Sequence, residues 1–219
     1  MKPTVPILLT FNGGYVDTAG FLLLQGLFTA HVTGNFVTLG ATVVHGTSGA
    51  MAKILALPVF CVVVILARAV AGYLVGEIAL KVLLSATIVL FAAAALLGTA
   101  LGPFNSADTA GALVTGMSLV AAMAIQNAVH RTHFSQSPPT TLMTGSTTQI
   151  MIDLADLMGG KMSAGDHAVA VTRSATLFRS VWVFALGCGL AALIYARLGA
   201  AVLLVPPVIA IMTLIARFR

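Results

Sequence analysis

Charged residues are scarce in this chain. Only 8% of its 219 residues are charged, whereas a soluble domain carries roughly a quarter. Hydrophobic residues make up 59%, and the mean hydropathy is +1.05. This balance excludes an ordinary soluble domain and indicates an all-α polytopic membrane protein.

Cysteines and known catalytic motifs are also few. The two cysteines, Cys61 and Cys188, lie inside apolar runs without metal-type spacing or a disulfide pattern. Nothing resembles a hydrolase triad, a phosphate-binding glycine loop or a nucleotide motif. The net charge is +5, but the basic residues stand singly between apolar segments, which is typical of topology signals. We therefore expect no enzyme, no cofactor, no bound metal and no nucleic-acid partner.

Apolar runs of two lengths divide the chain. Runs long enough to cross a bilayer, which needs about 20 residues, cover residues 5–28, 54–76, 82–101, 110–129, 177–195 and 200–216. Residues 35–44 and 144–158 are shorter and are expected to form half-helices. Residues 159–173 are expected to be the longest soluble connection. The sequence thus predicts about six full spans plus two short, broken helices.

A polar Thr-Gly pair occurs twice inside apolar surroundings. Thr33-Gly34-Asn35 is followed 111 positions later by Thr144-Gly145-Ser146. The order of long and short segments around the two pairs is also similar. We therefore predict an internal repeat, with residues 1–104 as the first membrane repeat and residues 105–219 as the second.

Polar breaks at corresponding places in two halves are the best sequence pointer to a transporter binding site. Half-helix N-termini attract anions through free N–H groups and the helix dipole. The predicted substrate-binding residues are the polar and glycine positions at or near the two breaks: Asp17, Thr33, Gly34, Asn35, Gln126, Asn127, Thr144, Gly145 and Ser146. The alternative is that the Thr-Gly pairs only cap and pack two close helices. With a binding site at the breaks, a buried Asp17 is expected to be the coupling group. The alternative for Asp17 is a helix-start residue at the membrane surface.

The basic residues indicate the topology. Counting each broken region as one crossing gives six crossings and inverted halves; counting each half-helix separately gives eight crossings and a parallel repeat. In the six-crossing arrangement seven basic residues share one side: Lys2, Lys81, Lys161, Arg173, Arg179, Arg217 and Arg219. Lys53 and Arg197 lie opposite, so both termini are expected to be cytoplasmic. The large lipid-facing surface is compatible with a homodimer, although the sequence has no dedicated signature for one.

Two motifs of the first half carry a family resemblance. Gly14-Tyr15-Val16-Asp17 and His31-Val32-Thr33-Gly34-Asn35 resemble the pattern of the bacterial YoaK family, catalogued as domain-of-unknown-function family 1275. Length and hydropathy agree across essentially the whole chain. The resemblance implies a multi-pass protein of the bacterial inner membrane, with about six spans and no established activity.

The expected function is secondary transport of a small solute, more specifically an anion or a carboxylate-bearing molecule. A passive channel is the first alternative. The second is a membrane scaffold or a metal-dependent membrane enzyme, in which His31, His130 and His133 would be the metal ligands. The expected partners are a small-molecule or ion substrate and the lipid bilayer.

From the sequence alone, Asn35→Ala and Thr144→Val are expected to weaken ligand binding and to leave insertion and folding intact. The reason is that both residues start predicted half-helices beside the site. Ligand-induced thermal stabilisation of the purified variants measures this, and wild-type binding by both variants would contradict a half-helix site.

Overall fold

The computed structural model describes residues 5–74, 76–141, 143–160 and 163–218. All regular structure within these ranges is helical, in the order α1 (Val5–Leu23), η1 (Val32–Gly34), α2 (Asn35–His45), α3 (Ala50–Tyr73), α4 (Glu77–Leu101), α5 (Ala110–His133), α6 (Thr144–Gly159), α7 (Ala164–Leu198), η2 (Gly199–Leu204) and α8 (Val205–Phe218). Lys2, Lys161 and Arg219 of the topology prediction lie outside the described residues.

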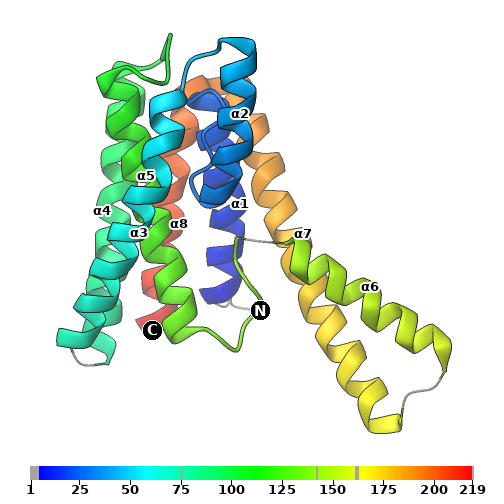
Figure 1. The fold of residues 1–219 in the computed structure, drawn as a ribbon. Coiled ribbons are helices and arrows are strands. Elements are labelled where there is room, and N and C mark those ends of the chain that lie inside the picture. Colours follow the sequence, from blue (N-terminus) through cyan, green and yellow to red (C-terminus); the bar gives the residue numbers. More distant parts are fainter. Residues whose placement is uncertain (1–4, 75, 142, 161–162, 219) are drawn as a thin grey trace.

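The long helices form one bundle (Figure 1). Helix α1 packs most extensively against α7, and α5 packs against both α3 and α4. Helix α8 packs against α4 and α1. The N- and C-terminal ends of the described chain lie at the same end of the bundle (Figure 1), as an even number of crossings requires.

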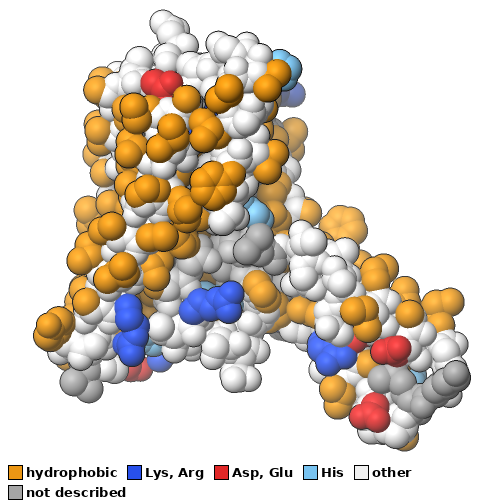
Figure 2. All heavy atoms as spheres, viewed as in Figure 1, with side chains coloured by type: hydrophobic (Ala, Val, Ile, Leu, Met, Phe, Trp, Pro, Cys, Tyr) orange, Lys and Arg blue, Asp and Glu red, His pale blue; other side chains and the backbone are white. Residues whose placement is uncertain are grey.

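The sides of the bundle are apolar. Large hydrophobic side chains stay exposed along the helices, and Figure 2 shows them spread over the visible face, with Lys and Arg near its lower end, at its upper right edge and on the projecting α6–α7 pair. Among the described residues, four helical stretches are long and apolar enough to cross a bilayer: Ala50–Tyr73, Glu77–Leu101, Ala110–His133 and Ala164–Phe218. Water would penalise so much apolar surface, and lipid would not. The chain is therefore a membrane protein with transmembrane helices.

The first half-helix forms where the sequence predicts it. Helix α1 ends at Leu23, and Gln25 and Gly26 follow with φ angles of 52° and 88°. This turn sends the chain back into the bundle, where η1 leads into α2. At 11 residues, α2 is too short to cross a membrane alone.

The expected soluble connection at residues 159–173 is wrong over most of its length. Helix α7 already begins at Ala164 and runs for 35 residues. The hydroxyl of Ser163 accepts a hydrogen bond from the N–H of Asp166 at 3.2 Å, which caps this early start. The polar residues in the first turns of α7 look like a loop in the sequence, so this part of the helix was not predicted. It packs against α6, and the pair projects from the bundle (Figure 1).

The two adjacent prolines of the last segment lie at a helix start. Pro206 and Pro207 fall in the first turn of α8, after the short helix η2. Proline lacks an N–H group, and the first turn of a helix needs none. Within the expected span of residues 200–216 the chain thus changes from a 3-10 helix to an α-helix.

Helices α1 and α7 cross with their backbones in contact. A Cβ atom added to Gly14 would lie 2.2 Å from the carbonyl oxygen of Phe184. One added to Gly187 would lie 2.2 Å from the carbonyl oxygen of Phe11. Neither backbone can move aside without breaking helical hydrogen bonds, so both glycines are required by this crossing.

We predict that Gly187→Ala lowers the free energy of unfolding by about 1–3 kcal/mol or more, because the added methyl group overpacks the crossing of α1 and α7. Gly189→Ala is the matched control, since a Cβ atom there meets nothing within 4 Å. Thermal unfolding in detergent compares the two. Equal midpoints for both variants would contradict the close approach of α1 and α7.

Candidate functional site

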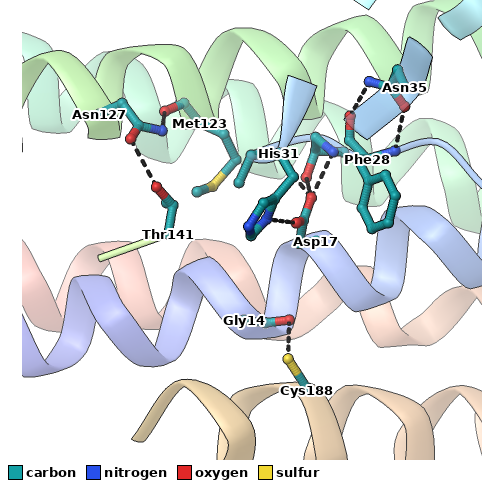
Figure 3. A network of polar contacts seen from close by, with 11 residues as sticks. Gly14, Asp17, Phe28, His31, Asn35, Met123, Asn127, Thr141 and Cys188 are labelled. Atoms are coloured by element: carbon teal, nitrogen blue, oxygen red, sulfur yellow. Dashed lines mark hydrogen bonds and ion pairs between the residues drawn. The ribbon is translucent and has the colours of Figure 1, made fainter. Parts of the chain in front are cut away.

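Asp17 fixes the first break from inside α1. Its carboxylate is 4% exposed and accepts hydrogen bonds from the N–H groups of Thr29 at 2.7 Å and Ala30 at 2.8 Å (Figure 3). The hydroxyl of Thr29 donates to the same oxygen at 3.3 Å. A buried carboxylate needs such partners. Asp17 is therefore an internal anchor for the backbone of the break.

His31 is also a hydrogen-bond partner of this carboxylate. Its Nδ1 atom lies 2.6 Å from the second oxygen of Asp17. An ionised carboxylate can only accept, so Nδ1 carries the hydrogen. The Nε2 atom is left as the free nitrogen of the ring.

Asn35 also serves the backbone of the break. Its Nδ2 donates to the carbonyl oxygen of Phe28 at 2.8 Å, and its Oδ1 accepts from the N–H of Phe28 at 2.8 Å (Figure 3). The side chain is 1% exposed. Both polar ends of this amide are thus used within the protein.

The irregular segment between the end of α5 and the second Thr-Gly pair, which we call the second break from here on, is fixed against α1 and α5. The hydroxyl of Thr141 donates to Oδ1 of Asn127 at 3.0 Å, and Nδ2 of Asn127 donates to the carbonyl oxygen of Met123 at 2.9 Å (Figure 3). A Cβ atom on Gly13 would lie 2.4 Å from the carbonyl oxygen of Thr140. The chain after α5 therefore returns to the middle of the bundle.

Both breaks line one cavity of about 390 Å³ between α3 and α5. Its lining comes from the two breaks and the two helices: Ala30, His31, Val32, Thr33, Phe60, Val64, Arg68, Asn127, Ala128, Arg131, Thr132 and Thr141. We call it the central cavity.

The lining of the central cavity combines cationic and apolar groups. Arg68 projects from α3 and Arg131 from α5, and no acidic residue belongs to the lining. Within the described part of the chain neither guanidinium has an ion-pair partner. Phe60, Val64 and Ala128 supply apolar surface. Such a cavity can neutralise its charge by holding an anion.

A second cavity, of about 470 Å³, lies on the other side of His31. It is lined mainly by apolar groups, including Phe21, Phe28 and Phe184, and also by Asp17 and Cys188. We call it the outer cavity. His31 belongs to the lining of both cavities.

The structure distributes the predicted site residues over several places. Thr33 and Asn127 line the central cavity, and Asp17 and Gly34 line the outer one. Gln126 is buried and bonds Asn12 and the carbonyl oxygen of Leu9.

The three predicted residues of the second Thr-Gly pair lie at the start of α6. Thr144 lines a separate groove along α6, a Cβ atom on Gly145 would meet open space, and Ser146 is buried. Helix α6 packs against α7, where Arg173, Ser174 and Gln149 surround the buried carboxylate of Asp153. This segment does not share the lining of the central cavity.

Sequence reasoning missed the two arginines as site residues. It considered His31 as a metal ligand in the second alternative. One usable signal was the spacing of Asn127 and Arg131, which puts them on one helix face. As for the proposed histidine ligands, no three His, Cys, Asp or Glu side chains within the described ranges gather as a metal site.

The contacts of Asn35 change the expectation for Asn35→Ala. The variant leaves the N–H and carbonyl groups of Phe28 without their partners, so we predict a loss of stability of about 1–3 kcal/mol. Thr33→Ala, at an exposed cavity residue, is the control and should unfold like wild type. Thermal unfolding without added ligand measures both, and a wild-type midpoint for Asn35→Ala would contradict a structural role.

Comparison with known proteins gives a family and no activity. No curated protein and no solved structure matches the chain. Residues 5–216 match the family described as "Protein of unknown function (DUF1275)", which covers nearly the whole chain. The resemblance found in the two first-half motifs is thereby confirmed, and the protein belongs to the DUF1275 family.

Proposed function

We propose that this protein is a membrane transporter of a small organic anion that carries a carboxylate. The observation that supports it most is the central cavity, where two arginines face a space to which both breaks contribute. In a membrane protein, charged side chains that line an interior cavity typically mark a substrate or ion pathway.

Charge favours an anion. Arg68 and Arg131 come from helices that pack against each other, and Asp17, which binds His31 of the same lining, already holds four hydrogen-bond donors. Both arginines are exposed, and two unpaired cations that line one cavity repel each other. A carboxylate between them would relieve this repulsion, since guanidinium binds carboxylate through two parallel hydrogen bonds.

Size and polarity favour an organic ligand. A volume of about 390 Å³ falls within the ~300–1,000 Å³ common for small-molecule sites. Thr33, Asn127 and Thr132 offer polar contacts, whereas Phe60 and Val64 offer an apolar wall. A carboxylate with a short apolar body matches both the polar and the apolar groups of the lining.

The helix contacts support the internal repeat. Exchanging α1 with α5, α2 with α6, α3 with α7 and α4 with α8 converts each main contact into another. Thus α1 packs on α7 as α5 packs on α3, and α2 pairs with α3 as α6 pairs with α7. We propose six crossings, by α1, α3, α4, α5, α7 and α8, with the two halves, residues 1–104 and 105–219, inverted. This architecture suits alternating access.

We place the protein in the bacterial inner membrane, with both termini cytoplasmic. Lys81 and Arg217 lie near the end of the bundle that carries the termini, where the side chain of Arg217 pairs with Glu77. An excess of Lys and Arg on one side indicates the cytoplasmic side.

A passive channel is the competing function, and counterflow separates the two. Proteoliposomes loaded with unlabelled lactate should accumulate labelled lactate transiently if the protein is a transporter. Flux proportional to the gradient, with no counterflow, would favour the channel.

We predict that Arg68→Gln and Arg131→Gln each weaken binding of carboxylates by about tenfold or more, because a hydrogen-bonded charge contributes roughly 1.5–3 kcal/mol. Titration calorimetry with acetate, lactate, benzoate and chloride on the purified protein measures this. Arg197→Gln is the matched control, an exposed arginine outside the central cavity.

Unfolding midpoints of all three variants show whether each is folded before its affinity is compared. If both cavity variants fold and bind the carboxylates as tightly as wild type does, this result would contradict an anion site between these arginines.

A further inference from the structure

His31 stands between two cavities with one ring nitrogen engaged. Nδ1 is fixed by Asp17 at 2.6 Å, and the ring contributes to the lining of both the central and the outer cavity. Of the residues that the structure describes, no other histidine lines either cavity.

The Asp17 carboxylate is held by four hydrogen-bond donors. One oxygen receives two backbone N–H groups and a hydroxyl, and the other receives His31. With Nδ1 of His31 donating to Asp17, the Nε2 atom carries the lone pair of the imidazole, and among the described residues it has no hydrogen-bond partner.

We infer that His31 is the proton-binding residue of the transporter and that proton and anion bind together. The inference rests on the proposed function. The proton adds to the lone pair of Nε2, gives an imidazolium paired with Asp17, and leaves from the same atom; no other bond forms or breaks.

The surrounding charges couple the binding of the proton to the binding of the anion. Asp17 on α1 favours the imidazolium, whereas Arg68 on α3 and Arg131 on α5 oppose it across the central cavity. Cys188 on α7 is the remaining titratable group beside His31, on the side of the outer cavity. An anion between the arginines cancels their opposition, so it raises the proton affinity of His31. By linkage, protonated His31 raises the affinity for the anion by the same factor.

The ring of His31 borders two cavities. The central cavity places it beside the proposed anion, and the outer cavity, also lined by Phe28 and Phe184, contacts the ring as well. A histidine is suited to this role because its ordinary titration falls between about pH 5 and about pH 8.

The test is proton uptake during lactate binding. Calorimetric titration of the purified protein with lactate, in buffers of different ionisation enthalpy, measures the protons taken up between about pH 5 and about pH 8. Wild type should take up protons with lactate and lose up to about tenfold in affinity per pH unit above the midpoint.

His31→Asn is the decisive variant, since its amide can replace Nδ1 as the donor to Asp17 but has no titrating nitrogen. It should bind lactate without proton uptake and without pH dependence. His45→Asn, at an exposed residue at the end of α2, should behave like wild type.

Three outcomes overturn the inference. Lactate binding by wild type without proton uptake overturns it and leaves the proposed function standing. Proton uptake that persists in folded His31→Asn does the same. Failure of wild type to bind any anion of the panel overturns the proposed function and this inference with it.

Discussion

A carboxylate inside an apolar bundle has to be fully hydrogen-bonded, and this requirement organises the first half of the protein. Asp17 obtains its partners from the backbone of Thr29 and Ala30 and from His31. The chain after α1 is thereby held inside the bundle. Asn35 fixes the same segment from the start of α2 through both backbone groups of Phe28. Without these bonds the irregular backbone would be too costly at this depth.

The same anchor connects structure with the proposed chemistry. Because the break is held in place, Thr33 and His31 form part of the wall opposite Arg68 and Arg131. The second break contributes Thr141, which Asn127 holds in turn. Rigid positioning of a few polar groups in an otherwise apolar space is what a selective small-molecule site needs. One pair, Asp17 and His31, thus supports both the fold and the coupling that we propose.

Local signals in the sequence predicted the helical membrane class and the start of both short helices. Composition indicates the class, and Gly34 and Gly145 with their polar neighbours mark the breaks. The length of α7 could not be predicted, because its polar first turns look like a loop until α6 packs on them. The roles of Asn35 and Gln126 were equally hidden, since a buried amide can serve a ligand or the backbone. Arg68 and Arg131 form a site only through the packing of α3 on α5.

The most direct measurement is an experimental structure with para-bromobenzoate bound, in which anomalous scattering locates the bromine. The account predicts a bromine peak inside the central cavity, with the carboxylate between Arg68 and Arg131. A single bromine site beside Cys188 in the outer cavity, or sites confined to the lipid-facing surface, would contradict it.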